Sequence, residues 1–370
     1  MGSPTQGVEK QLAGGIFGNG PSLKKNSDTY YSGLVGVFSE LFPDFGRFAD
    51  APRTPQEKSV VRGHLDEAFI YLRTDQERAS AKMDELVRLL RTSSPEKPGQ
   101  PVPPNSSTAG DPPSTGMERP PTLAGWNNPV GHYLQDRFNA AMSHDGLDVA
   151  VELREPDEER EAAVDESYRV LAGCLPEIGP STAAMVDGIA LFRGKPHSAY
   201  ITGTPVVVYV NEDWITDALH GADSLLHETL HQKLVDFGLT RRMLRSGYLD
   251  ADSSRAPVPW GGTGRTFSAD RTLAAYHVYV HLTLLHCAAL QHGDALGLPH
   301  SDDEVEARTA VRWARARYLG SRFDDPAMDR ELDVDGRALV SWLWRANEEL
   351  GTLALPSGRI LATYDQAHGG

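Results

Sequence analysis

A proline-, serine- and glycine-rich segment interrupts the chain and limits how it can fold. Residues 95–121 contain almost no large apolar side chains. Such a segment cannot bury enough apolar surface to offset the conformational entropy that it would lose on folding. We therefore expect a mobile linker or insert at 95–121, with an N-terminal helical region over residues 1–94 before it.

The charge balance excludes several classes of partner. The 370 residues include 51 acidic and 36 basic side chains, a net charge of −15. An acidic protein is a poor match for nucleic acid or an anionic membrane, because both require basic surface. No run of about 18 apolar residues predicts a membrane span, and the first residues lack the pattern of a secretory signal. We expect a cytoplasmic protein with neither partner.

Apolar residues recur mostly at helical spacing. The predicted helices cover residues 29–45, 54–91, 129–142, 155–175, 270–291, 303–319 and 335–350. Two β-branched runs, 186–193 and 199–210, predict strands, and Pro205 near the start of the second favours an edge position. The expected fold class is α+β, mainly α-helical with a small mixed or antiparallel sheet. Residues 122–300 would form a catalytic region, and a C-terminal helical region, 301–370, would pack on it.

The strongest chemical signal is the pentapeptide His227-Glu228-Thr229-Leu230-His231. The flanking sequence predicts a helix that is capped by Asp223 or Ser224 and ends near Gly238. On a helix, residues four apart share a face, so both imidazoles can reach one metal ion. Glu228 would then lie beside the metal as a base or as a hydrogen-bonding group. The alternative is a buried helix with two incidental histidines.

Two histidines leave the metal's ligand set incomplete. A metzincin would place a third histidine at position 237, which is Phe237, and a gluzincin would use a downstream glutamate. No glutamate occurs between Glu228 and Glu304. Asp250 or Asp252 is a possible ligand, although the loop around them has none of the expected protease signatures.

The predicted helix at 270–291 is a better source of a third ligand. His277 and His281 are four residues apart and can face one point. His286 and His292 fall on other faces, so we interpret them as core or surface histidines. Three neutral imidazoles suit a catalytic zinc with its water, or iron(II) that also binds a 2-oxo acid and dioxygen.

A 2-oxo diacid would need a cation for its distal carboxylate. The candidate cations are Arg265, Arg271 and Lys233. For each of these three residues, the alternative interpretation is an ordinary surface charge or local ion pair.

Several of these features occur together in one known family. The string LLHETLHQKL, the pair Pro259-Trp260, Arg265 and His277 resemble the HExxH-motif peptide-modification proteins, which accompany ribosomal peptide biosynthesis. These are also described as 2-oxoglutarate-dependent HExxH-type peptide β-hydroxylases. The resemblance covers residues 185–290, and Lys233 completes the family's approximate H-E-x-x-H-x-K-L pattern. The spacing from Trp260 to His277 matches the family, which favours His277 over His281 as third ligand.

The resemblance implies an iron(II)- and 2-oxoglutarate-dependent oxygenase of natural-product biosynthesis. Its substrate would be a peptide or amino acid, free or carrier-bound, hydroxylated at an unactivated (β) carbon. His227, His231 and His277 would hold iron, with His281 as the alternative third ligand. Arg265, or Lys233 as second choice, would bind the distal carboxylate.

Two other interpretations remain open. The same histidines would bind zinc in a peptidase, with Glu228 as the general base. In the oxygenase, Glu228 would instead orient a ligand or a bound water. The third interpretation is a non-catalytic protein that binds peptides or partners.

Overall fold

The computed structural model describes residues 4–51, 53–93, 118–144, 151–262, 264–353 and 364. Their contacts divide the chain into two compact units. Unit 1 comprises residues 1–24, 170–182 and 229–370, and unit 2 comprises residues 25–169 and 183–228. The boundaries fall inside four helices that continue from one unit into the other: α3 (Gly20–Leu41), α8 (Glu158–Cys174), α9 (Ile178–Ala183) and α10 (Ala218–Thr240).

Most of the predicted linker, residues 95–117, lies outside the described residues. The last four residues of the predicted segment, 118–121, are held against unit 2. The Arg119 guanidinium forms ion pairs with Asp165 and, at 2.6 Å, with Glu161. The Pro121 carbonyl accepts a 3.0 Å hydrogen bond from the N–H of Ile189 in the sheet.

Unit 2 contains a four-stranded mixed sheet with strand order β1-β2-β4-β3. The strands are β1 (Glu152–Arg154), β2 (Gly188–Arg193), β3 (Ser198–Tyr200) and β4 (Val207–Asn211). The central strands β2 and β4 are parallel, with Ile189 opposite Val208, and both outer strands run antiparallel to their neighbours.

The predicted strand at 199–210 is in fact two strands. A turn closed by the Thr204 N–H and the Ile201 carbonyl separates β3 from β4. The prediction that Pro205 marks an edge strand was wrong, because Pro205 precedes β4 and takes no part in its hydrogen bonds. β4 is internal, and β3 is the edge strand.

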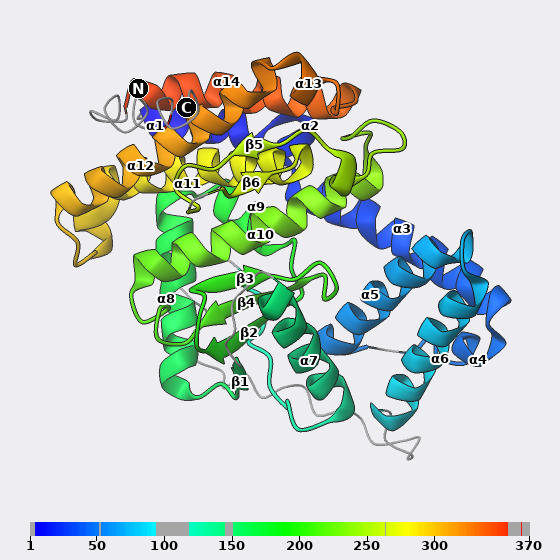
Figure 1. Cartoon of the computed structure of the whole chain (residues 1–370). Helices are drawn as coiled ribbons and strands as arrows, with labels where there is room; N and C mark the ends of the chain where they lie inside the picture. Colours follow the sequence, from blue (N-terminus) through cyan, green and yellow to red (C-terminus); the bar gives the residue numbers. More distant parts are fainter. Residues whose placement is uncertain are drawn as a thin grey trace. The chain divides into compact units, whose positions relative to one another are not determined.

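Unit 2 also contains several helices. They are α4 (Pro43–Gly46), α5 (Pro55–Leu72), α6 (Gln76–Ser93) and α7 (Pro129–His144), together with most of α3. The single helix predicted at 54–91 is interrupted at residues 73–75, where the Asp75 side chain accepts the N–H of Arg78 and starts α6. In α7, the Phe138 ring stacks on Tyr209 at 4.5 Å and lies 5.0 Å from Phe192, which seats α7 against the sheet (Figure 1).

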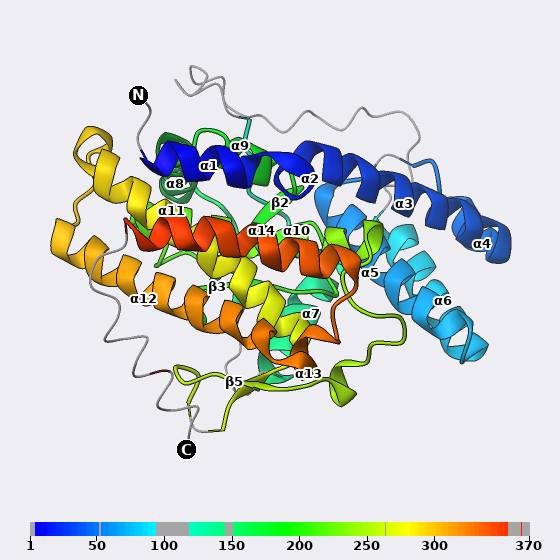
Figure 2. The ribbon, with the colours of Figure 1, turned by 90° about the horizontal axis from the view of Figure 1, so that it is seen from above.

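Unit 1 is built around one long helix. Its helices are α1 (Pro4–Ala13), α2 (Gly15–Gly18), α9 (Ile178–Ala183), α11 (Ala269–Leu296), α12 (Asp302–Ser321), α13 (Pro326–Asp329) and α14 (Val334–Gly351). Two 3-10 turns, Asp250–Asp252 and Arg322–Asp324, and a short hairpin of β5 (Ala256–Pro257) and β6 (Thr266–Phe267) complete it. α1, α12 and α14 pack on α11 (Figure 2).

α11 is long and apolar enough to cross a membrane by length and composition. Within the structure, however, 78% of its apolar stretch is buried, as in the central helix of a folded domain. Both units together confirm the predicted fold class: mainly helical, with a small mixed sheet and a two-stranded antiparallel sheet.

Candidate metal centre

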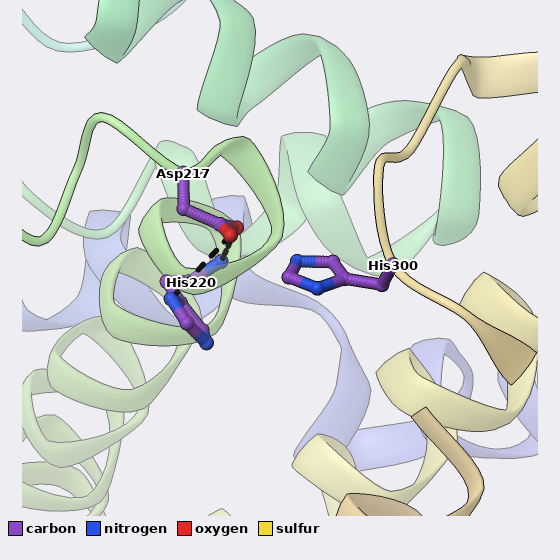
Figure 3. Close-up of side chains that lie close together, drawn as sticks. All are labelled: Asp217, His220 and His300. Carbon is purple, nitrogen blue, oxygen red and sulfur yellow. Dashed lines mark hydrogen bonds and ion pairs between the residues drawn. The ribbon is translucent and has the colours of Figure 1, made fainter. Parts of the chain in front are cut away.

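The motif helix begins earlier than the sequence predicted. Asp217 caps it, because its Oδ1 accepts the backbone N–H groups of Leu219 and His220, each at 3.0 Å. Figure 3 shows the Asp217 carboxylate directed at His220, whose Nδ1 lies 3.6 Å from Oδ2. The predicted cap at Asp223 or Ser224 was therefore wrong, since both residues are buried inside the helix.

Gly221 lies inside the first turns of α10, where a Cβ atom would come within 2.0 Å of the Ser167 hydroxyl. The glycine therefore permits close packing of α8 on α10 and does not interrupt the helix. α10 runs to Thr240 and holds the motif in its middle.

The three motif side chains form a group that can hold a metal ion. One ligand atom from each of His227, Glu228 and His231 lies within 4.8 Å of the other two. Both histidines are partly exposed and Glu228 is buried. Two imidazoles and a carboxylate are donors that suit zinc or iron. This is the arrangement that the four-residue spacing of the histidines predicted.

Glu228 is held from the edge of the sheet. Ser198 in β3 donates a 2.5 Å hydrogen bond from its hydroxyl to Glu228 Oε1. Burial raises the pKa of Glu228, and the nearby Asp223 adds to this effect. The field of His227 and hydrogen bonds from Ser198 and the Tyr200 backbone act in the opposite direction and lower the pKa. The carboxylate is thus fixed in place, in an environment that favours proton uptake.

His277 lies against α10. Its ring is fully buried and packs edge-on against Phe237, with the ring centroids 6.2 Å apart. Neither ring nitrogen has a hydrogen-bond partner of normal geometry, although the Leu230 backbone is near enough to favour the protonated ring. Burial, followed by the fields of His281, Lys233 and His231, lowers the pKa of His277 far below its usual range.

Leu230, Lys233 and Phe237 follow one another at spacings of three and four residues and so share a face of α10. His227 lies three residues before Leu230 and four before His231, so the motif histidines border this face. The His277 nitrogens are not among the donor atoms grouped within 4.8 Å of one another. Its role as third ligand therefore stays a prediction.

His281 belongs to the same buried cluster as His277. The two rings lie 4.7 Å apart, and His281 Nδ1 is 2.8 Å from the His277 carbonyl. Its Nε2 is buried without a hydrogen-bond partner. Burial lowers the pKa of His281 to about 3, with a further contribution from Lys233, so the ring is neutral at physiological pH.

The two predicted carboxylate-binding cations differ sharply. Lys233 is 2% exposed, and its amine donates one long hydrogen bond, 3.3 Å, to the Gly18 carbonyl. Among the residues that the structure describes, no carboxylate pairs with it. Burial lowers the pKa of Lys233 to about 7. Arg265, by contrast, is exposed in the β5–β6 hairpin, with its guanidinium 5.6 Å from the Phe267 ring centroid.

The remaining candidates lie in ordinary environments. Arg271, Asp250 and Asp252 are exposed, His292 is partly exposed and His286 is buried in α11. Trp260 packs edge-on against Tyr279 and Tyr318, with ring centroids 6.0 and 5.6 Å away. The described contacts of Trp260 therefore indicate a packing role.

Sequence reasoning missed two features of this region. The first is Ser198, which lies 30 residues before its partner Glu228 and carries no motif. The second is a stack of three rings in unit 2, in which Trp214 lies between His197 at 3.7 Å and His220 at 4.1 Å. The three ring residues occur at irregular spacing, so no local periodicity reveals the stack.

Comparison with known proteins adds no family assignment. No protein-family model matches the sequence, and neither does any of the curated proteins. The resemblance to HExxH peptide-modification proteins therefore rests on the motif residues alone, and the function must be argued from the site.

Proposed function

We propose that this protein is an iron(II)- and 2-oxoglutarate-dependent oxygenase that hydroxylates an unactivated β carbon of a peptide or amino-acid substrate. The single observation that carries the proposal is the buried amine of Lys233, two residues after the motif, which has no carboxylate partner among the described residues. A buried ammonium without a counter-charge is costly, because burial removes its hydration. A cosubstrate that brings its own carboxylate would supply that charge.

The metal would be held on α10. His227 and His231 offer imidazole nitrogens one helical turn apart, and the Glu228 carboxylate lies with them. His277 is the proposed third ligand. Support comes from its two buried ring nitrogens, which lack hydrogen-bond partners, and from its electrostatic interaction with His231. Its low pKa keeps the imidazole neutral, which is the form that binds a metal.

The chain's own residues would then divide the remaining tasks. Lys233 would bind and orient the distal carboxylate of the cosubstrate, and Arg265, which is exposed, becomes the second choice. Glu228, held by Ser198, would position a water or substrate group beside the metal. Apolar side chains such as Leu230 and Phe237, both fully buried, would exclude water from this side of the helix. Iron, when bound, supplies the oxygen activation that breaks an unactivated C–H bond.

Turnover of the cosubstrate tests the proposal. Protein purified without oxygen and supplied with iron(II) should convert 2-oxoglutarate to succinate when air and a panel of peptides or amino acids are added. His231→Ala should abolish this conversion, whereas His292→Ala, which changes a histidine in α11 outside the cluster, should retain it. Wild-type protein that never consumes 2-oxoglutarate across the panel would contradict the proposal.

A zinc peptidase is the second candidate, and one specific observation favours it. Glu228 is buried, adjoins both histidines and has a raised pKa, as a general base for water activation requires. Zinc would lower the pKa of its bound water. This candidate gives no role to the buried Lys233, and for that reason we place it second.

A further inference from the structure

Unit 2 contains a cavity that is separate from the motif residues. It has a volume of about 410 Å³ and is lined by residues of α3 and α5 together with Ala49, Asp50 and Arg53. Three cationic side chains line it: Arg53, Lys58 and Arg62. Two acidic residues, Asp28 and Asp50, also line it, so the lining carries one more positive than negative charge.

Arg62 is the most buried of these cations. Its side chain is 4% exposed and lies with its guanidinium 4.4 Å from the centre of the Tyr31 ring. One terminal nitrogen, Nη2, pairs with Asp28. The other, Nη1, is buried and has no hydrogen-bond partner. Buried guanidinium N–H groups are normally paired, so Arg62, a residue of the cavity lining, carries a donor whose hydrogen bond is unmet.

Arg53 presents a second donor of this kind. Its Nη2 donates hydrogen bonds to the carbonyls of Phe48 and Ala49, at 3.0 and 3.3 Å. These two bonds hold the guanidinium against the backbone at residues 48–49. Its Nε is buried without a hydrogen-bond partner. Among the described residues Arg53 forms no ion pair. Burial lowers the pKa of Arg53, although Glu57 and Asp50 act in the opposite direction.

Lys58 lines the cavity too, but its charge is already paired. Its amine lies 2.7 Å from Asp187 and 3.9 Å from Asp28, and the side chain remains partly exposed. The rest of the lining includes apolar side chains, notably Val35, Val61 and Leu65. The cavity therefore combines unpaired guanidinium donors with an apolar wall.

We infer that this cavity binds an oxyanion, a carboxylate or a phosphate, carried by a small molecule with a short apolar part. The oxyanion would accept hydrogen bonds from Arg53 Nε and Arg62 Nη1, the two donors that lack partners. Arginine suits this task because its N–H groups are fixed in a plane and stay charged. The apolar part of the ligand would contact Val35, Val61 and Leu65. The inference is independent of the proposed oxygenase activity, because none of these residues belongs to the motif helix.

Titration calorimetry of the full chain tests the inference with two probes, inorganic phosphate and butyrate. Binding of phosphate alone would identify a phosphorylated ligand, binding of butyrate alone a carboxylic acid, and binding of both an oxyanion site of either kind. Arg53→Gln should weaken the binding about tenfold, the loss expected for a charged hydrogen bond. The matched control, Arg47→Gln, removes an exposed arginine that pairs with Asp44 and should leave binding unchanged.

Two results would overturn the inference. Absence of binding for both probes, or equal weakening by Arg53→Gln and Arg47→Gln, would contradict it. Should Arg53→Gln fail to fold, Lys58→Gln offers the same comparison at a partly exposed position, and unchanged binding there would count against the site.

Discussion

The hydroxyl of Ser198 donates a 2.5 Å hydrogen bond to the carboxylate of Glu228. Ser198 belongs to the edge strand β3, and Glu228 is the buried acid of the HExxH motif in α10. The sheet thus fixes the orientation of the one acidic group that lies with both motif histidines. This contact gives the small sheet a role in the candidate metal centre.

Removal of the Ser198 hydroxyl should destabilise the protein. In Ser198→Ala, the buried Glu228 loses a hydrogen-bond donor, and the free energy of unfolding should fall by about 1–2 kcal/mol. Denaturation by urea measures this change. Ser198→Thr is the control, because it retains a hydroxyl at the same atom position and should lose less. Equal stability of Ser198→Ala and the wild type would show that the hydrogen bond contributes nothing.

The two buried histidines of α11 provide a matched pair for the third-ligand prediction. His277→Gln should lower the metal content of purified protein, because the proposal gives His277 a direct bond to the ion. His281→Gln, one turn further on and equally buried, should lower it far less. Metal analysis by mass spectrometry, with circular dichroism to confirm folding, makes the comparison. The opposite ranking would assign the ligand to His281. Metal content as high as in the wild type in both variants would show that α11 supplies no ligand.

Lys233 and Arg265 can be separated by the affinity for 2-oxoglutarate. Lys233→Gln should weaken cosubstrate binding at least about tenfold, since a hydrogen bond between charged groups contributes about 1.5–3 kcal/mol. Arg265→Gln, at an exposed position, should change it little. Equilibrium binding measured without oxygen avoids dependence on turnover. A larger effect of Arg265→Gln would indicate that Arg265, and not Lys233, binds the distal carboxylate.

Glu228→Gln distinguishes the two candidate enzymes. A peptidase loses its general base and should cleave no peptide at all. An oxygenase keeps its histidines and the acceptor for Ser198, so succinate formation should persist within about tenfold of the wild type. Both assays use the same preparation, with metal content measured in parallel. Peptide cleavage by the wild type that disappears in the variant would favour zinc hydrolysis.

Acid should weaken one ion pair in unit 2. Interaction with His64, whose Nε2 lies 3.7 Å from Glu85 Oε2, and then the field of Lys82 lower the pKa of Glu85 from 4.5 to about 2, although partial burial acts in the opposite direction. Because the folded-state pKa is depressed, the stabilisation is fully present above pH 4.5 and is lost as the pH falls toward 2. Thermal unfolding across this window should show a shallower pH dependence in Glu85→Gln. The same pH dependence of unfolding in Glu85→Gln and in the wild type would contradict the lowered pKa of Glu85.

Sequence periodicity predicted the helical character of the fold well, because amphipathic spacing is a local property. The helices predicted at 129–142, 303–319 and 335–350 match α7, α12 and α14 to within a few residues. The grouping of His227, Glu228 and His231 also followed from local geometry alone, since residues one turn apart meet on any helix. Both kinds of prediction depend on local geometry, which tertiary contacts do not easily change.

The errors arose where distant residues decide the outcome. The helix cap is Asp217, six residues before the predicted Asp223, and Gly221 between them allows the close approach of Ser167. Pro205 precedes an internal strand because the partner strands come from elsewhere in the chain. The burial of Lys233, which reverses its rank relative to Arg265, depends on the packing of α10 within unit 1. None of these contacts leaves a periodic signal.

The most direct test of the central claim is spectroscopic. Protein purified without oxygen should bind one iron(II) and, on titration with 2-oxoglutarate, develop a visible charge-transfer band that saturates at one equivalent. His227→Ala and His231→Ala should lack the band, and His292→Ala should retain it. A wild-type protein that binds iron without developing the band, or that develops it equally in the His227→Ala and His231→Ala variants, would contradict the account.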